Sequence, residues 1–463
     1  MNTRLSAPSP RLREEGRGEG LSPQAQTRAN APSPTLSPQA GRGVERRGAC
    51  PGLSAPMPTG DGLLVRMMPA GPIPPTAFAA FCEAARKHGN GTLEVTARGS
   101  LQVRGLTPHS AQPFASAVAV LDIAAEGVPV IASPLDEPDA AIDADHLAAE
   151  LRRALAETRL VLAAKVSVVV DGGSRLHLDA ISADVRLRAV ASAARPRLCI
   201  GLGGDGAAPT WLGTIAPDRA AEAVVGLMGV IAARGPAARA ADVLRTEGIR
   251  AFASVAGDCV EPSPAPAPRK PAEPIGLHEL RDGRLAVGLA PAFGHAHADA
   301  LCELARVAAT NGAETIRTAP PRALLLVGLD PANTAGVVRA ADELGFVTQA
   351  ADPRRRIAAC PGAPACASGL IRARELVAAL VPALATQLAS DSRPADPVKI
   401  HVSGCVKGCA HPRTAAFTVV GTEHGCGIVR DGPARGVPSH YVDPADLAAA
   451  VARLMAENGA RRG

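Results

Sequence analysis

The chain contains two copies of one structural unit, and this duplication limits the available folds more than any other feature. Three local matches reveal it, and the members of each pair lie 220 or 221 residues apart. A near-constant offset across three matches predicts an internal repeat. The matched pairs are Asp61-Gly62 with Asp282-Gly283, Phe81-Cys82-Glu83 with Leu301-Cys302-Glu303, and Asn90-Gly91 with Asn311-Gly312.

Each copy is predicted to begin with a strand that leads into a helix. In the first copy, the apolar run over residues 63–67 indicates the strand, and residues 74–87 have helical periodicity. Gly89-Asn90-Gly91 should end this helix, because Gly and Asn are typical helix terminators. Two more strands are predicted over residues 92–98 and 101–104.

A proline-rich segment over residues 261–274 divides the chain just before the second copy and is typical of a semi-rigid linker. The predicted fold class is α+β, with each copy followed by a longer α+β segment. The predicted organisation is a tail over 1–45, a first copy over 46–126, a first α+β segment over 127–260, the linker over 261–274, a second copy over 275–350 and a cysteine-bearing segment over 351–463.

Residues 1–45 are rich in Pro, Ser, Arg, Gly and Gln and show no apolar periodicity. A segment of this composition cannot bury enough apolar surface to fold, so we expect it to be disordered. We interpret it as an over-extended start, with the natural N-terminus near Val44.

The composition is that of a soluble globular protein. Hydrophobic residues make up 47% of the 463 residues and charged residues 20%, and no apolar run is long enough for a membrane span. The net charge of +5 is spread along the chain and aromatic residues amount to only 2%, which argues against nucleic-acid binding. Ten cysteines in so long a chain, with no secretory signal, indicate a reducing compartment, so we expect a cytoplasmic protein.

Four cysteines in two pairs are the strongest chemical signal. Cys360 and Cys366 are spaced C-x5-C in a Pro/Gly-rich stretch, and Cys405 and Cys409 are spaced C-x3-C. Four thiolates are the usual ligand set of a [4Fe–4S] cluster. Zinc is the competing metal, although C-x5-C lies outside its common spacings. The remaining alternative is a set of buried or redox-idle thiols.

Two weaker signals carry no assignment. Gly201–Gly206 matches G-x-G-x-x-G, but the residues that follow are poor material for opening a helix, so we predict a hairpin turn instead of a nucleotide site. Single histidines are more often ordinary core or surface residues than metal ligands. Those near the second copy and the cysteines are His295, His297, His401, His411 and His424.

The predicted strands of the first copy carry a set of polar side chains. Arginine forks suit carboxylates, and several together would hold a polycarboxylate ligand. The alternative is that they are solvated strand residues. The second copy has Gly288 in place of Arg66, so the two copies have diverged. The set is Arg66, Thr96, Arg98, Gln102 and Arg104.

Taken together, these residues resemble the sirohaem sulfite/nitrite reductase superfamily from Cys50 onward. The specific parts are the two cysteine pairs, Thr96-Ala97-Arg98 with Gln102 four residues on, and the duplication. Within the superfamily the chain is most similar to the precorrin-3B synthases. The segments that carry this similarity are Cys50-Pro51-Gly52-Leu53, residues 59–66 and residues 403–412. The reductases usually have Pro-Asn where Val406-Lys407 stand.

The resemblance implies a duplicated pair of ferredoxin-like half-domains, each followed by an α+β domain of the iron–sulfur/tetrapyrrole type. It implies a [4Fe–4S] cluster on Cys360, Cys366, Cys405 and Cys409. The reductases carry a second lysine two residues beyond the position of Lys165, and Ser167 stands there in this chain. This weakens the case for reduction of a small oxyanion. The implied substrate-binding residues are Arg66, Thr96, Arg98, Gln102 and Lys165.

The implied reaction is O2-dependent hydroxylation of precorrin-3A at C20 with lactone formation, in cobalamin biosynthesis. Electrons would come from NADH through a reductase partner and the cluster, and a mononuclear non-haem iron would activate O2. Neither the ligands of this iron nor a catalytic residue is assigned. The alternatives are a sirohaem-dependent sulfite or nitrite reductase and an iron–sulfur electron carrier without a substrate of its own.

Overall fold

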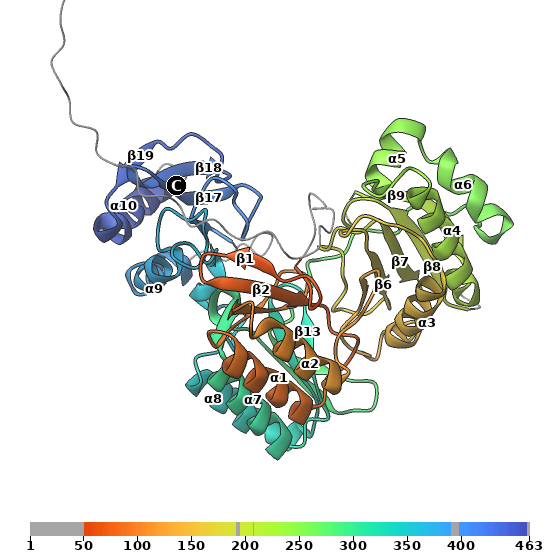
Figure 1. The fold of residues 1–463 in the computed structure, drawn as a ribbon, viewed down its shortest axis with the longest axis horizontal. Coiled ribbons are helices and arrows are strands. Elements are labelled where there is room, and N and C mark those ends of the chain that lie inside the picture. The colour runs from red at the N-terminus through yellow and green to blue at the C-terminus, as the bar shows by residue number, and fades with distance from the viewer. Residues whose placement is uncertain (1–50, 191–194, 207, 390–397, 461–463) are drawn as a thin grey trace, which may run out of the picture. The chain divides into compact units, whose positions relative to one another are not determined.

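The two copies form two antiparallel sheets with helices packed against them (Figure 1). The computed structural model describes residues 51–190, 195–206, 208–389 and 398–460. The first copy consists of β1 (Met57–Thr59), β2 (Gly62–Met67), α1 (Pro75–His88), β3 (Thr92–Val95), β4 (Leu101–Leu106) and α2 (Ala111–Leu121). The second consists of β10 (Gly276–Glu279), β11 (Leu285–Leu289), β12 (His295–His297), α7 (Ala298–Thr310), β13 (Thr315–Ala319), β14 (Ala323–Leu329) and α8 (Thr334–Glu343).

The two copies exchange strand pairing. β12, which precedes α7 in the second copy, pairs antiparallel with β3 of the first copy. In return, Ile73, which precedes α1 in the first copy, exchanges both backbone hydrogen bonds with Ile316 on β13, at 3.0 and 2.7 Å. Each copy therefore completes the hydrogen bonding of the other.

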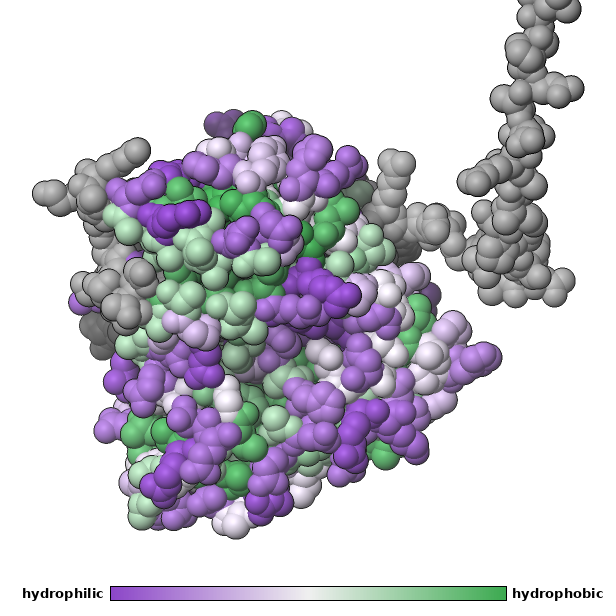
Figure 2. Space-filling model, turned by 90° about the vertical axis from the view of Figure 1, so that its left-hand side faces the viewer, coloured by the Kyte–Doolittle hydropathy of each residue, from purple (hydrophilic) through white to green (hydrophobic). Residues whose placement is uncertain are grey.

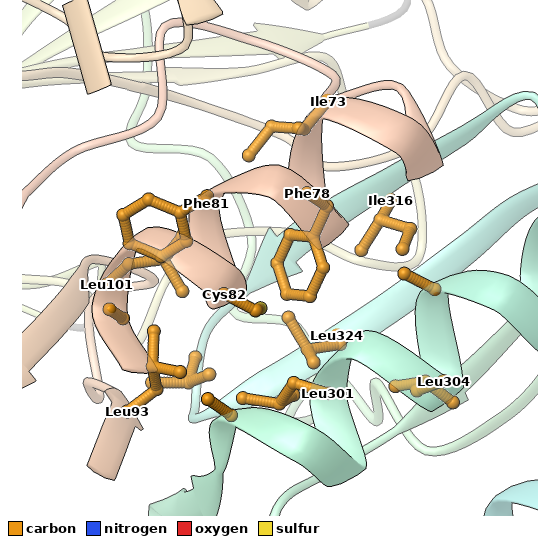
Figure 3. Packing of buried hydrophobic residues seen from close by; sticks show 14 of the residues in the cluster. Ile73, Phe78, Phe81, Cys82, Leu93, Leu101, Leu301, Leu304, Ile316 and Leu324 are labelled. Carbon is orange, nitrogen blue, oxygen red and sulfur yellow. The ribbon is translucent and has the colours of Figure 1, made fainter. Parts of the chain in front are cut away.

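One hydrophobic core lies between the two copies. α1 begins with Pro75 at its first position, where the missing N–H costs nothing, and ends before Gly89. Its buried face carries Phe78 and Phe81, which pack with Leu301 and Leu304 of α7 (Figure 3). α1 and α7 lie side by side (Figure 1), so the apolar faces of both helices are buried together.

Each half-domain is followed by a five-stranded sheet of the same strand order, three parallel strands and then two antiparallel ones. The first contains β5 (Val130–Ala132), α3 (Ala144–Glu157), β6 (Val168–Asp171), β7 (Val185–Val190), β8 (Arg197–Leu202), β9 (Thr210–Ile215) and α4 (Ala220–Ala232), and it continues into α5 (Ala240–Glu247) and α6 (Arg250–Ala256). The second contains β15 (Ile357–Ala359), α9 (Ala373–Ala389), β16 (Ile400–Ser403), β17 (Ala415–Thr422), β18 (Gly425–Gly432), β19 (His440–Val442) and α10 (Leu447–Ala460). The duplication therefore extends beyond the half-domains in which the sequence reveals it.

The first copy departs from its predicted strands at Thr96 and Arg98, which lie in the turn between β3 and β4. β3 ends at Val95 because the Thr96 hydroxyl accepts hydrogen bonds from the backbone N–H groups of Arg98 (3.4 Å) and Ser100 (3.0 Å). Gly99 has a φ of 80°, which closes the turn.

Two other local predictions can be compared with the structure. The G-x-G-x-x-G stretch is a hairpin between β8 and β9, as predicted. Its φ angles are 64° at Gly203 and 65° at Gly204. The apolar run after Lys165 predicts a strand over residues 165–170, but Lys165 itself lies in the turn before β6 and its side chain is exposed. The buried residues Val166 and Ser167 then lead into β6, which begins at Val168.

Residues 1–45 and Cys50 lie outside the described residues, and the predicted domain boundaries remain predictions. None of the helices in the described ranges is both long and apolar enough to cross a membrane. On the face shown in Figure 2, hydrophilic and hydrophobic side chains are interspersed.

We expect Phe78→Ala to destabilise the paired half-domains. Phe78 is 1% exposed and lies between the two copies, so truncation should cost about 3–5 kcal/mol of unfolding free energy. Urea unfolding followed by circular dichroism measures this loss. Val120→Ala on α2 is the control, because Val120 is 86% exposed and should change stability by less than about 0.5 kcal/mol. Equal effects of both substitutions would contradict a shared core.

Candidate metal centre and substrate site

The four predicted ligand cysteines lie on two loops that leave neighbouring parallel strands. Cys360 and Cys366 follow β15, and Cys405 and Cys409 follow β16. β15 and β16 pair in parallel, with Ala359 opposite Val402, so both loops leave the same edge of the sheet. Carboxyl ends of adjacent parallel strands are a common place for a binding site. The fold therefore brings together the two cysteine pairs that are separate in sequence.

The two cysteine loops touch through backbone and glycine contacts. The N–H of Gly404 donates to the Cys360 sulfur at 3.0 Å, and its carbonyl accepts from the N–H of Leu370 at 2.8 Å. A Cβ at Gly404 would lie 2.9 Å from the Cα of Gly362 and 3.5 Å from the Cys360 sulfur. Lys407 Nζ also donates to Ser368 Oγ at 2.8 Å. No side chain fits between the loops at this point.

The thiols influence one another electrostatically. Burial raises the pKa of Cys360, and the charges of Cys366 and Cys409 raise it further. Two backbone hydrogen bonds to its sulfur lower the pKa but do not outweigh these effects. Burial also raises the pKa of Cys409, and Cys405 and Cys366 add to the increase. Metal coordination would offset the raised pKa values, because it stabilises the thiolate form directly. Cys360 and Cys409 are therefore expected to be protonated without a metal, and a bound metal would convert them to thiolates.

The spread of the sulfur atoms distinguishes a cluster from a zinc ion. Zn–S bonds of about 2.3 Å in a tetrahedral site place the sulfurs only about 3.8 Å apart. Among the described residues, one group has three potential metal-ligand atoms within 4.8 Å of one another. It consists of Asp171, His177 and Asp179 and contains no cysteine. No three of the four cysteine sulfurs lie within 4.8 Å of one another, so they do not form a compact tetrahedral zinc site. Four thiols are the usual donor set of a [4Fe–4S] cluster.

Two of the predicted substrate residues are joined by a hydrogen bond. Arg66 on β2 donates from Nε to the side-chain oxygen of Gln102 on β4, at 2.7 Å. Gln102 is buried, and its amide in turn donates to Glu94 on β3. Arg374 of α9 reaches the other oxygen of Glu94. The predicted substrate residues on the first sheet are therefore linked to the cysteine-bearing domain.

Arg98 points away from this group toward the first five-stranded domain. Its guanidinium donates to the carbonyl oxygen of Ser182 at 2.7 Å and to the hydroxyl of Ser167 at 3.0 Å. Ser167, which the resemblance implies stands where the reductases carry a second lysine, accepts a hydrogen bond from Arg98 and so helps to orient this arginine. Lys165 lies two residues earlier and is exposed. Thr96 shapes the turn that carries Arg98.

Arg98 also lines a small cavity of about 40 Å³ with other arginines. Arg317 of β13 pairs with Asp145, with an N–O distance of 2.6 Å, and Arg152 of α3 donates to the carbonyl oxygen of Val130 at 2.9 Å. Burial lowers the pKa of Arg152, and its Nε has no partner in the described structure. A cluster of guanidinium groups with one carboxylate favours a second anionic group nearby.

Sequence reasoning missed Glu94 and Arg374. They join β3 to α9 across 280 residues of sequence, so no local spacing connects them. The only available signal was the alternation on β3, which places Glu94 between two buried apolar residues, Leu93 and Val95. A carboxylate there is buried only because arginines and an amide surround it.

The first five-stranded domain has no cysteines at the corresponding loops, which follow β5 and β6. They line a cavity of about 440 Å³ together with the linker. Asp171, His177 and Asp179 converge there, but Arg269 of the linker forms ion pairs with both aspartates. The Arg269 guanidinium already neutralises the two aspartates, so Asp171, His177 and Asp179 do not fit a metal ion in this arrangement.

Two histidines near the cysteine domain are held neutral by burial. Burial and the nearby charge of Arg374 lower the pKa of His295 to about 4, against the charge of Glu94. Burial and the neighbouring His411 and Arg322 lower the pKa of His401 to about 4. Both ring nitrogens of His401 are without a partner in the described structure. Neither histidine lies in a convergent ligand group.

The comparisons with known proteins agree with this architecture. Residues 55–121 match the family model described as the nitrite/sulfite reductase ferredoxin-like half domain. The chain is 38% identical over 415 residues to a precorrin-3B synthase of Sinorhizobium sp., which covers 88% of both chains. The chain belongs to the precorrin-3B synthase family. The predicted membership of this family is therefore confirmed.

The precorrin-3B synthase family shares its fold with the reductases. The chain is 32% identical over 160 residues to a sulfite reductase [ferredoxin] of Mycolicibacterium paratuberculosis, covering 34% of this chain and 29% of that one. The structure of the NirA protein of Mycobacterium tuberculosis superposes with a TM-score of 0.68 at 20% identity, covering 84% of this chain and 80% of that one. This likeness shows the fold alone, and it confirms the predicted α+β class with duplicated half-domains.

We expect Gly404→Ala to prevent the two cysteine loops from closing. The added methyl group would press on Gly362 and the Cys360 sulfur, so iron and sulfide content after anaerobic reconstitution should fall well below the wild-type level. Gly229→Ala on α4 is the matched control, because a Cβ there meets nothing within 4 Å. Full iron and sulfide content in Gly404→Ala would contradict the close contact.

Proposed function

We propose that this protein is a precorrin-3B synthase that hydroxylates precorrin-3A at C20 with lactone formation. One oxygen atom of O2 enters the product, and the other leaves as water with two protons and two electrons that originate from NADH. A separate reductase passes these electrons to the protein. The observation that carries the proposal is the 38% identity over 88% of the chain, together with the four cysteines on two touching loops.

The cysteine loops have a definite part in this proposal. Cys360, Cys366, Cys405 and Cys409 hold a [4Fe–4S] cluster, which supplies single electrons when bound. The Gly404 N–H donates to the Cys360 sulfur and stabilises its thiolate form. No described residue is assigned to the non-haem iron that the family resemblance implies.

The arginines of the first half-domain bind the substrate. Precorrin-3A is a polycarboxylate, and guanidinium groups recognise carboxylates through two parallel hydrogen bonds. Gln102 fixes the orientation of Arg66, and Ser167 and Ser182 fix that of Arg98. Two oriented arginines on different elements restrict how the macrocycle can lie, so one meso carbon is presented to the oxidant. Thr96 and Lys165 complete the proposed set.

We expect the reconstituted protein to convert precorrin-3A into a product heavier by one oxygen atom. The protein is incubated anaerobically with precorrin-3A, an electron donor is supplied and O2 is then admitted. Mass spectrometry with labelled O2 identifies the source of the added atom. Incorporation of oxygen from water, or no change in mass with a loaded cluster, would refute the proposed reaction.

The same preparation tests the reductase alternative. Purified protein with a sirohaem absorption spectrum and sulfite or nitrite reduction would support a reductase. A cluster spectrum with additional non-haem iron and no sirohaem would exclude it. Ser167 favours the synthase, since it stands where a reductase carries a lysine and it binds Arg98.

We expect Arg98→Ala to weaken precorrin-3A binding about tenfold or more, because a hydrogen bond to a charged group contributes about 1.5–3 kcal/mol. Cluster content should stay at the wild-type level, since Arg98 contacts Ser167 and Ser182 in the other five-stranded domain. Fluorescence or absorbance titration measures the affinity. Arg234→Ala, at an exposed ion pair with Glu247, is the control. Unchanged affinity would favour an electron carrier without its own substrate.

A further inference from the structure

Each cysteine loop is bound by an arginine from a different half-domain. Arg104, on β4 of the first half-domain, donates from Nη2 to the carbonyl oxygen of Ala365, the residue before Cys366. Arg322, in the β13–β14 turn of the second, donates from Nη2 to the carbonyl oxygen of Ala410 at 2.8 Å, the residue after Cys409. Arg104 belongs to the polar set of the first copy, but neither arginine is among the residues proposed to bind the substrate, which are Arg66, Thr96, Arg98, Gln102 and Lys165.

Arg104 is a buried cation that the structure holds rigidly. Its side chain is only 4% exposed, and it donates to both oxygens of Asp61 at 2.9 Å. Burial lowers the pKa of Arg104, but the hydrogen bond to Asp61 and the charges of Glu94, Asp61 and Cys366 outweigh it and raise the pKa. The same guanidinium therefore holds the loop by a hydrogen bond and places a positive charge next to the residue that precedes Cys366.

The positive charge of Arg322 has fewer carboxylates near it than that of Arg104. Burial lowers its pKa, and Glu94 is the one carboxylate that opposes this shift. The fold nevertheless makes room for the side chain, because a Cβ at Gly294 would lie 2.5 Å from the Arg322 Cδ. A buried guanidinium with so little local compensation favours an anion nearby. Four thiolates on iron make an anionic centre, and the Arg322 guanidinium is bound beside one of its loops.

We propose that Arg104 and Arg322 are positioning residues of the cluster, which hold the two cysteine loops together and stabilise the reduced state. The inference rests on the proposed function, because it assumes that the four cysteines hold a cluster. Reduction adds one electron to an already anionic centre, and two adjacent guanidiniums lower the electrostatic cost of that electron. No bond is made or broken in this step. An electron donor of a given potential then reduces a larger fraction of the protein.

The first five-stranded domain has similar arginine contacts on loops that carry no cysteine. Arg98, in the turn between β3 and β4, donates to Ser182 on the loop after β6, as Arg322 donates to Ala410 on the loop after β16. Arg281, before β11, donates to the carbonyl oxygen of Ala140 on the loop after β5, at 2.6 Å. Arg98 and Arg322 stand at corresponding turns of the two copies, whereas Arg104 on β4 and Arg281 before β11 stand at different positions of the repeat. Of these four arginines, Arg104 and Arg322 contact the loops that carry cysteines. Arg281 provides a matched control.

The test is a redox titration of the full-length, reconstituted protein with dithionite, followed by electron paramagnetic resonance of the reduced cluster. Each of the two arginines is replaced by Met, Gln and Lys. Met removes charge and donor, Gln keeps a donor without charge, and Lys keeps the charge. Arg281→Met is measured in parallel. Iron and sulfide content is measured for every variant.

We expect each Met and Gln variant to lower the ratio of reduced to oxidised cluster at a fixed potential at least tenfold, which corresponds to about 59 mV for one electron. The Lys variants should stay close to the wild-type ratio, and Arg281→Met should match it. A change of stability alone would lower cluster content without moving the potential of the cluster that remains.

The outcomes separate this inference from the proposed function. A wild-type protein that takes up no iron and sulfide would overturn the proposed function. A wild-type cluster whose potential is unchanged in Arg104→Gln and Arg322→Gln would overturn the inference and leave the function standing. If a Met variant does not fold, which circular dichroism would reveal, the Gln variant at the same position decides.

Discussion

The exchange of strand pairing between the two half-domains is the constraint on which the rest of the structure depends. β12 completes the first sheet, and Ile73 completes the pairing of β13. Neither half-domain can shift without breaking hydrogen bonds in the other and opening the core between α1 and α7. Because this relation is fixed, Arg104 and Arg322 reach the two cysteine loops from opposite half-domains at the same time.

Glu94 determines how so many arginines can be buried near one another. It accepts hydrogen bonds from Gln102 and Arg374 and lies 3.7 Å from Arg104. A buried charge of either sign is costly alone, so the carboxylate and the guanidiniums are stable only as a set. The set joins β2, β3 and β4 to α9. The same residues that orient Arg66 therefore also fix the cysteine-bearing domain against the first sheet.

Local patterns predicted much of this structure, and long-range partners were beyond them. The duplication could be predicted because short motifs recur at a nearly constant offset. The cysteine pairs could be predicted because the spacing within each pair is short. Strand alternation gave the wrong element for Arg98, since the Thr96 hydroxyl ends β3 through hydrogen bonds that no periodicity shows. The pair Glu94–Arg374 spans 280 residues. The repeat of the five-stranded domain left no matching motif in the sequence, and it was expected only from the family resemblance, which implies one α+β domain after each half-domain.

The duplication also explains why only one half-domain carries the proposed substrate residues. Gly288 stands where the first copy has Arg66, and the carbonyl oxygen of Pro274 in the linker occupies the place of a side chain there. The linker also brings Arg269 to Asp171 and Asp179, at the loops that correspond to the cysteine loops. In one five-stranded domain an arginine from the linker neutralises two aspartates, and in the other the arginines of the half-domains contact the cysteine loops. The linker covers the second copy at Gly288, whereas the first sheet carries Arg66 and Gln102, the residues that we propose bind an anionic macrocycle.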